Sequence, residues 1–240
     1  MALKDEINRE TVKLKDMTFK KKAAYIWEYY KFHIIGVIAA VVFVCVFIRD
    51  LRMNKRPVYL DVVILNSDMA YRDDNPLQDD YVKYAGVDTR AYNISFDTAF
   101  LISESGTDQM TVANMQKLMA LFAAGSIDVI LGPDSLVDTY GNLDAFADIS
   151  EVIPADLQQR LLDSGYEMYY ATVYEEDKNG ELKPVSTYPA GFYLDDSDYM
   201  NSLGVFATQK ALGKRPVFAL ASCCTNTDNA LKLLKMLTGL

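Results

Sequence analysis

An uninterrupted apolar run constrains this chain more than any other feature of its sequence. The seventeen residues 32 to 48 read FHIIGVIAAVVFVCVFI, and their only basic or acidic side chain is His33, at one edge. At about 1.5 Å per residue the run spans about 25 Å, slightly less than the roughly 30 Å hydrocarbon core of a bilayer. The run therefore predicts a membrane-spanning helix that flanking amphipathic residues complete.

Those flanking residues precede the run. Aromatic side chains favour the headgroup zone of a bilayer, and a lysine next to them extends its ammonium group to water. The residues with these properties, which we expect to contact the membrane, are Trp27, Tyr29, Tyr30 and Lys31, with Tyr25 one turn earlier. The sequence thus predicts a transmembrane signal-anchor helix over residues 25–48.

The distribution of basic residues predicts the orientation of this helix. Eight lysines and arginines precede the span and four follow it closely, and the more basic flank stays in the cytoplasm. We therefore expect a cytoplasmic basic arm at 1–24, a stalk at 49–56 and an extracellular domain at 57–240, in a single-pass protein of the cell membrane. A cleaved signal peptide is the alternative, but no small-x-small cleavage pattern follows Ile48.

Charge separates the two sides of the span. Residues 1–56 carry 12 basic and 6 acidic side chains, whereas residues 57–240 carry 12 basic and 27 acidic side chains, so the net charges are +6 and −15. A strongly acidic domain repels nucleic acid and anionic lipid and attracts cations. Beyond the lipid bilayer, the expected partners are therefore a small cationic or peptide ligand or another envelope protein.

The domain shows strand and helix patterns that alternate. Apolar, β-branched runs predict buried strands at 58–66, 127–131 and 217–221, and residues 92–102 predict a further strand with a polar break at Asp97. Thr107 and Asp108 cap a predicted helix that Gly125 ends, and the strand that follows completes a βαβ unit, which favours a parallel sheet. Further helices are expected at 134–140, at 155–162 and after residue 225, and the acidic stretch 67–80 is expected to be a loop.

A hairpin is predicted near the middle of the domain. Residues 166–174 and 182–194 flank Asn179-Gly180, a pair that supplies the positive φ angles of a type I′ turn. We expect this hairpin to be an appendage of the sheet.

The order of these elements resembles a known family. Residues 117–133 read KLMALFAAGSIDVILGP, residues 148–154 read DISEVIP, and residues 215–237 read RPVFALASCCTNTDNALKLLKML. These segments resemble type 2 extracellular solute-binding proteins. Together with the entry YIWEYYKFHIIG at 25–36, the chain is similar to uncharacterised single-pass membrane proteins of Gram-positive gut bacteria (Firmicutes).

The resemblance implies a periplasmic-binding-protein-like α/β fold, but the chain departs from that family in size. Type 2 binding proteins close two lobes around a ligand, whereas residues 57–240 suffice for one lobe, with the hairpin at 166–194 in place of the second. The expected fold is therefore a transmembrane helix followed by a single-lobe, mostly parallel sheet with flanking helices. The only tryptophan, Trp27, belongs to the membrane segment, which disfavours sugar binding by stacking.

The chemical inventory disfavours an enzyme. The only histidine is His33, which excludes His-based general base catalysis, Ser-His-Asp triads and zinc sites with histidine ligands in the domain. Phosphate-binding and metalloprotease motifs are absent as well. We expect no cofactor, no metal and no catalytic residue. Cys223 and Cys224 are interpreted as small residues that close a buried strand, with a vicinal redox disulfide as the alternative.

A ligand site is expected where parallel strands end. Ligands of open α/β sheets bind beyond the carboxyl ends of the strands. The side chains that follow two predicted strands there are Asn66, Ser67 and Asp68 after the first and Gly132, Pro133 and Asp134 after the third. Ordinary turn chemistry is the alternative role for these six. The predicted function is a membrane-anchored extracellular binding or interaction module of unknown ligand; the alternative is a structural or scaffolding subunit of an envelope complex.

Overall fold

The computed structural model describes residues 18–54, 56–103, 106, 108–141, 144–178 and 180–240. Contacts divide the chain into two compact units, Met1–Lys55 and Arg56–Leu240. Most of the predicted basic arm lies outside the described residues, as do Thr107 of the predicted helix cap and Asn179 of the predicted turn.

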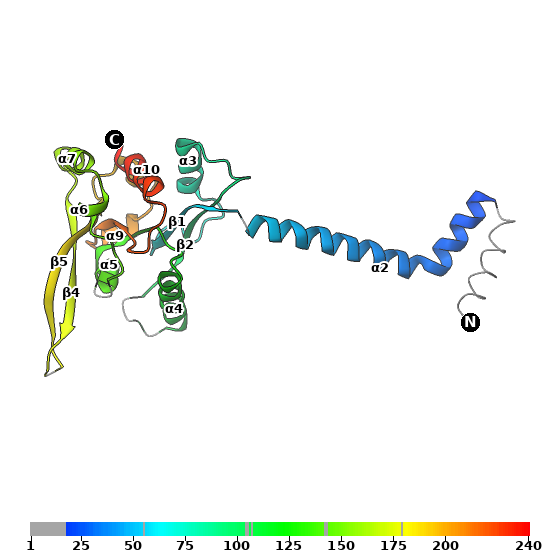
Figure 1. Ribbon diagram of the computed structural model, residues 1–240, viewed down its shortest axis with the longest axis horizontal. Helices are drawn as coiled ribbons and strands as arrows, with labels where there is room; N and C mark the ends of the chain where they lie inside the picture. Colours follow the sequence, from blue (N-terminus) through cyan, green and yellow to red (C-terminus); the bar gives the residue numbers. More distant parts are fainter. Residues whose placement is uncertain (1–17, 55, 104–105, 107, 142–143, 179) are drawn as a thin grey trace. The chain divides into compact units, whose positions relative to one another are not determined.

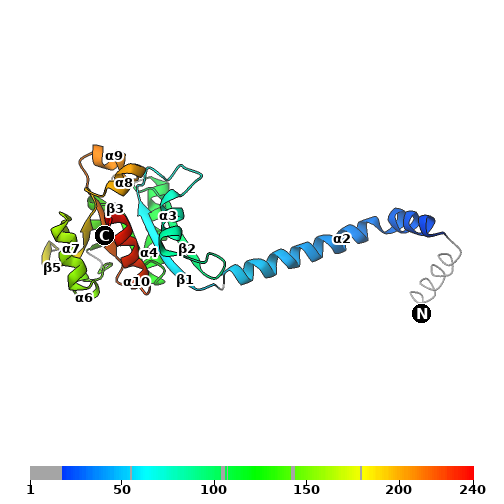
Figure 2. The same ribbon diagram turned by 90° about the horizontal axis from the view of Figure 1, so that it is seen from above.

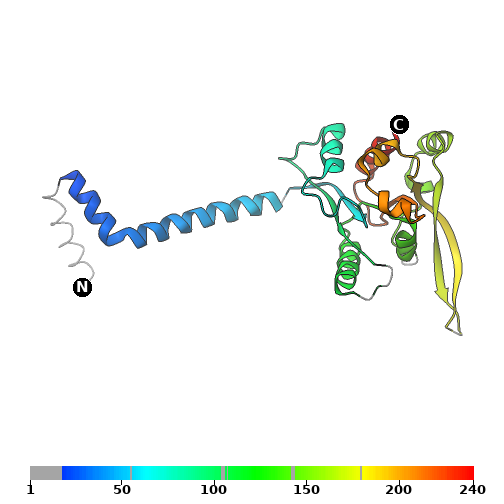
Figure 3. The same ribbon diagram turned by 180° about the vertical axis from the view of Figure 1, so that it is seen from behind.

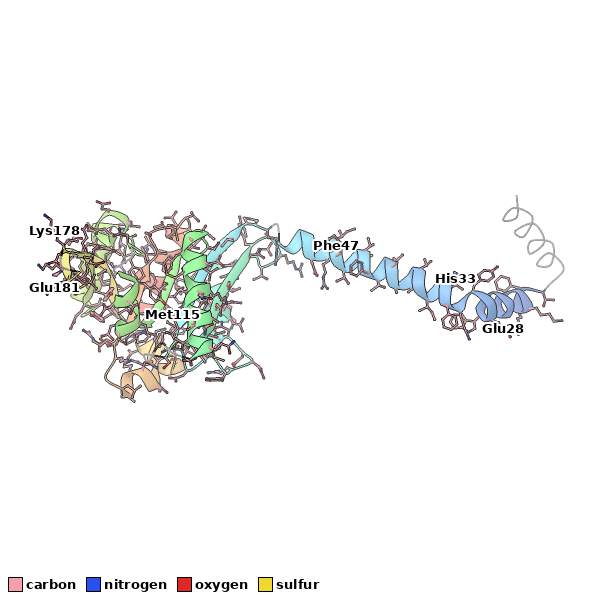
Figure 4. The ribbon with its side chains drawn as sticks, turned by 90° about the horizontal axis from the view of Figure 1, so that it is seen from below. Glu28, His33, Phe47, Met115, Lys178 and Glu181 are labelled. Carbon is pink, nitrogen blue, oxygen red and sulfur yellow. The ribbon has the colours of Figure 1, made fainter. Side chains whose placement is uncertain are left out.

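The first unit contains one long helix, α2 (Phe19–Asn54). Its segment Tyr30–Asp50 has the length and composition of a membrane span, which agrees with the predicted apolar helix. Trp27, Tyr30 and Lys31 are exposed on it, whereas the side chain of Tyr29 lies outside the described part. Figure 4 shows Glu28, His33 and Phe47 projecting from this helix. The first six residues of the predicted stalk, 49–54, continue the helix.

The second unit is an α/β domain with one mixed sheet. Its strands are β1 (Val58–Leu65), β2 (Asn93–Phe100), β3 (Val129–Pro133), β4 (Met168–Glu176), β5 (Leu182–Tyr193) and β6 (Pro216–Leu220). Its helices are α3 (Pro76–Ala85), α4 (Gln109–Ala123), α5 (Asp134–Gly141), α6 (Ile149–Val152), α7 (Ala155–Asp163), α8 (Asp198–Leu203), α9 (Ala207–Ala211) and α10 (Thr227–Thr238).

The six strands lie in the order β2-β1-β3-β6-β5-β4. β1 runs parallel to β2 and β3, whereas β6, β5 and β4 each run antiparallel to the preceding strand in this order. The prediction of a mostly parallel sheet is thus right for β2-β1-β3 and wrong for the other half. The reason is that β6 begins where β3 ends, with Pro216 opposite Pro133, and must run back along it.

The β4–β5 hairpin belongs to this sheet and is not a separate appendage. Gly191, Phe192 and Tyr193 at the base of the hairpin pair with β6. The pairing requires glycine, because a Cβ on Gly191 would lie 1.9 Å from the carbonyl oxygen of Phe218. The rest of the hairpin projects beyond the helices of the domain (Figure 1), with Lys178 and Glu181 at its tip (Figure 4).

Helices cover both faces of the sheet. In Figures 1 and 3, α3 and α4 lie on opposite sides of β1 and β2, and α10 packs beside α3 (Figure 2). The buried apolar side chains form two clusters, one on each face, to which α3, α7 and α10 contribute on one side and α4 and α5 on the other. The Tyr81 hydroxyl donates to the Asn229 carbonyl oxygen at 2.7 Å and links α3 to α10.

Local sequence explains where two of these helices begin. The Asp108 carboxylate accepts a hydrogen bond from the Thr111 N–H at 2.8 Å and caps α4, as predicted. The helix α3 was not predicted, since its first residues were assigned to an acidic loop. Asn75 caps it through the Gln78 N–H, and Pro76 occupies its first position, where a proline fits.

A buried aspartate joins three elements of the domain. Asp128, which is 3 % exposed, accepts hydrogen bonds from the Asp61 N–H on β1 at 2.9 Å and from the Thr225 and Asn226 N–H groups at 3.1 and 3.2 Å. The side-chain amide of Asn226 also donates to it, at 3.0 and 3.2 Å. A buried carboxylate is stable only with such donors, so Asp128 fixes the start of α10 against β1.

We expect Asp128→Ala to destabilise the domain by about 2 to 4 kcal/mol, because it leaves several buried N–H donors without an acceptor. Urea unfolding of the full-length protein, followed by the near-UV circular dichroism of its tyrosines, measures the loss. Asp73→Ala, which truncates an exposed aspartate, is the control and should change the free energy of unfolding by less than about 0.5 kcal/mol.

A second aspartate near the first gives the domain a pH-dependent stability. Burial, with a contribution from the charge of Asp128, raises the pKa of Asp61 to about 6, above its value of about 3.9 in unfolded chains. The folded domain therefore binds this proton more tightly, and the group's unfavourable contribution grows as the pH rises from about 4 to 6. We expect Asp61→Asn to raise the melting temperature at pH 7 and to leave it unchanged near pH 3.5. A difference that is independent of pH would contradict this assignment.

Candidate functional site

A tyrosine-lined groove lies beside the β4–β5 hairpin, with a volume of about 530 Å³. It is lined by Asp138 and Thr139 of α5, by Tyr169, Tyr170, Thr172 and Tyr174 of β4, and by Leu182 and Tyr193 of β5. Consecutive residues of a strand place their side chains on opposite faces. Because Tyr169 and Tyr170 both line the groove, it follows the edge of β4 and not one face of the sheet.

A carboxylate stands in this groove. The hydroxyl of the buried Tyr169 donates to Asp138 at 2.6 Å. The helix that carries Asp138 packs tightly on β4, since a Cβ on Gly141 would lie 3.1 Å from the Cβ of Ala171. Partial burial of its carboxyl raises the pKa of Asp138, the hydrogen bond from Tyr169 opposes this rise, and the charge of Asp134 adds to it.

An ion-pair network fixes the inner end of the groove. The Arg215 guanidinium lies 3.7 Å from the ring centre of Tyr193 and binds Glu167 at 2.9 Å and Asp195 at 2.6 Å. Burial alone would lower the pKa of Arg215, but the hydrogen bonds to Asp195 and Glu167 raise it, so its charge is permanent. The Tyr193 ring meets the Tyr169 ring edge to face at 5.7 Å. These contacts hold the tyrosine beside Asp138 in one orientation.

The groove has the composition of a cation site. Asp138 is accessible to solvent, and in the described part of the chain no lysine, arginine or histidine forms an ion pair with it. Tyrosine rings attract ammonium groups through their negative faces, and a carboxylate adds a charge-assisted hydrogen bond. An amine in the groove would complete the pairing of Asp138.

The three residues predicted after the first strand are used mainly to hold the fold. The Asn66 side chain, on a residue with φ of 50°, exchanges two hydrogen bonds with the main chain of Ile102, at 2.7 and 2.8 Å. Ser67 accepts from the Met69 N–H, and Asp68 accepts from the Thr208 N–H at 2.8 Å. They line a second hollow of about 370 Å³, but their polar atoms serve turns and strand ends.

The other predicted triplet begins within β3, the strand next to β1. Gly132 and Pro133 were expected in a turn after β3. They are instead the last two residues of that strand, because they pair with Val217 and Pro216 of β6. A Cβ on Gly132 would lie 2.9 Å from the Cβ of Leu65, so this glycine serves close strand packing. Asp134 accepts from the Ser135 and Arg215 N–H groups at 2.9 and 3.3 Å. The hydrogen bonds of the two triplets thus go to separate main-chain partners.

The two cysteines of the domain, and Asp195 and Ser197, have local structural roles. Cys223 and Cys224 are both free and partly buried, directly after β6, and burial raises the pKa of Cys224 to about 11. A thiol with that pKa is a poor nucleophile at neutral pH. Asp195 binds Arg215, and Ser197 caps α8 by accepting from the Met200 N–H at 3.1 Å.

Comparison with known proteins gives no further assignment. No protein-family model, curated protein or solved structure matches the chain. The resemblance to solute-binding proteins therefore has only the sequence segments behind it.

The residues of the groove were not singled out from the sequence. Asp138 and Tyr169 are separated by 31 positions and belong to a short helix and to the hairpin, two elements that the sequence does not connect. One signal was present: tyrosines recur through the hairpin, at 166, 169, 170, 174, 188 and 193. That density of aromatic residues with polar tips is unusual for a solvated appendage.

Proposed function

We propose that this chain is a membrane-anchored binding module whose α/β domain takes a cationic ligand in the groove between α5 and the hairpin. In this proposal α2 spans the cell membrane with its basic end in the cytoplasm, and the domain faces the outside. The observation that supports it is the accessible Asp138 carboxylate, held by Tyr169 among aromatic rings and without a basic partner among the described residues.

Physical chemistry favours an amine for this groove. An ammonium group over a tyrosine ring gains about 0.5 to 2 kcal/mol, and a hydrogen bond to a carboxylate is roughly twice as strong as a neutral one. The net charge of −15 on residues 57–240 adds long-range attraction. Polyamines, and lysine or arginine side chains of peptides, carry the required group.

A scaffolding role is the second candidate. The hairpin exposes large apolar and aromatic side chains, among them Tyr170, Leu182 and Val185, and Leu182 is 67 % exposed. Exposed apolar side chains that gather on one projecting element are typical of a protein contact. In this reading the groove is part of a protein interface within an envelope complex.

We expect the full-length protein in nanodiscs of zwitterionic lipid to bind spermidine, and Asp138→Asn to weaken that binding about tenfold or more, because the ammonium group loses its charged acceptor. Isothermal titration calorimetry measures the affinity, and zwitterionic lipid avoids binding of the polyamine to the membrane.

Asp156→Asn is the matched control, because Asp156 is an exposed aspartate of α7 away from the groove. It changes the net charge equally and should keep the affinity. Binding should also decline as the pH falls toward the raised pKa of Asp138, since protonation removes the negative charge. Equal affinities of the two variants would contradict a role for the groove.

The orientation is tested separately. In intact bacterial cells that produce the protein, protease added outside should degrade residues 57–240 and leave a short fragment that contains α2, because the proposed topology exposes the domain. Immunoblotting against tags at the two ends measures this. Protection of the domain until the cells are lysed would reverse the topology.

A further inference from the structure

The two outer strands of the sheet, β2 and β4, differ in whether side chains occupy the main-chain hydrogen-bonding groups at their free edges. At the β2 edge, the Phe96 N–H donates to the side-chain oxygen of Gln78 at 3.0 Å, and the Phe96 carbonyl oxygen accepts from the side-chain amide of Asn75 at 2.8 Å. Side chains from the start of α3 therefore occupy hydrogen-bonding groups that another strand would use. Such protection prevents unwanted pairing with other chains.

The β4 edge has no comparable protection. Among the described residues, no side chain hydrogen-bonds to the main chain of Met168–Glu176, and this segment contains neither proline nor lysine. Its neighbour β5 carries Pro184 and Pro189, and both irregularities of the pairing fall on β5, where Val185 and Ala190 are the extra residues. β4 is thus a regular strand of nine residues with an open edge.

The register shows which groups point to that edge. Pro189 lies opposite Tyr170, and Pro184 lies opposite Tyr174. Because proline cannot donate to the ladder, these are positions whose main-chain groups point away from the partner strand. The N–H and C=O groups of Tyr170, Thr172 and Tyr174 accordingly point away from β5, and the same three residues line the groove.

We propose that an extended, basic segment of a partner protein adds to the sheet along β4 as a seventh strand and places a lysine or arginine next to Asp138. This inference rests on the proposed function for the site, but it specifies the partner: a peptide strand and not a free amine. Main-chain hydrogen bonds to Tyr170, Thr172 and Tyr174 supply affinity, and Asp138 selects the side chain.

Charge selects this occupant over a second copy of the chain. Glu167 precedes β4, and Glu175 and Glu176 end it; all three are exposed. A basic peptide strand would meet acidic side chains at both ends of the edge, where Glu175 and Glu176 stand at one end and Glu167, which also binds Arg215, stands at the other. A second copy would bring the same acids into the interface, which is unfavourable for strands that lie side by side.

The experiment uses the full-length protein in zwitterionic nanodiscs and a fluorescein-labelled nine-residue peptide in which lysine alternates with valine or threonine. In one version of the peptide the odd-numbered residues carry N-methyl groups, and in the other version the even-numbered residues carry them. Each version therefore keeps the N–H donors of one edge and loses those of the other edge. Fluorescence anisotropy measures the affinities.

We expect one methylated peptide to bind at least about tenfold more weakly than its parent and the other to stay within about threefold, because strand addition uses one edge of the peptide. Equal affinities of the two methylated peptides would overturn strand addition. This measurement requires no change in the protein, so it does not depend on the folding of a variant.

A matched pair of variants tests the protein side. Thr172→Pro removes an N–H from the open edge of β4, whereas Thr187→Pro makes the same change on the directly opposite residue of β5. Both variants lose the hydrogen bond between the two threonine hydroxyls. We expect Thr172→Pro to weaken peptide binding about tenfold, and Thr187→Pro to retain it.

The outcomes separate the two proposals. If spermidine binds and the two methylated peptides bind with equal affinity, strand addition is overturned and the cation groove is supported. If the two methylated peptides differ in affinity and spermidine does not bind, strand addition is supported and the free amine is overturned as a ligand. Self-association of the protein in detergent that Thr172→Pro abolishes, measured by sedimentation, would assign the edge to a second copy and overturn the basic partner.

Discussion

The buried carboxylate of Asp128 is the interaction on which the arrangement of this domain depends. It lies at the start of β3, between the parallel half of the sheet and the antiparallel half, and it accepts donors from β1 and from the turn that leads into α10. Main-chain hydrogen bonds reinforce it there, since the Asp128 N–H donates to the Asp61 carbonyl oxygen and the Ala221 N–H donates to that of Asp128. The register of β3 with β6 is thus fixed at one end.

That register determines what meets at the other end. With Val129 opposite Leu220, Pro133 must lie opposite Pro216, which brings Asp134 next to Arg215. Arg215 in turn orders Tyr193 and the base of the hairpin. The order of the groove therefore depends on a pairing that begins at the opposite end of β3 and β6, which explains why a groove without a sequence motif can be well defined.

The sequence predicts the local elements better than their assembly. The strand β1, the helix α4 with its Asp108 cap and the closing helix α10 follow from apolar runs and capping residues, whose physical chemistry is local. The direction of β6 and the membership of the hairpin in the sheet depend on pairing between distant segments, which periodicity does not specify. Gly191 illustrates the point, because only the approach of the Phe218 carbonyl shows why a glycine is needed there.

The groove at β4 could not be predicted for the same reason, because the rule used for the sequence considers only the carboxyl ends of parallel strands. The Asn66 side chain joins the carboxyl end of β1 to the segment after β2, and Asp68 accepts from the Thr208 N–H of α9, so both side chains have main-chain partners. Hydrogen-bonding groups without a partner among the described residues lie instead along the outer side of β4, which pairs only with β5, and at Asp138, which has no basic partner there. A buried or paired polar group stabilises the fold, whereas an accessible group with remaining capacity is available to a ligand, and in this domain the second kind concentrates along one strand edge.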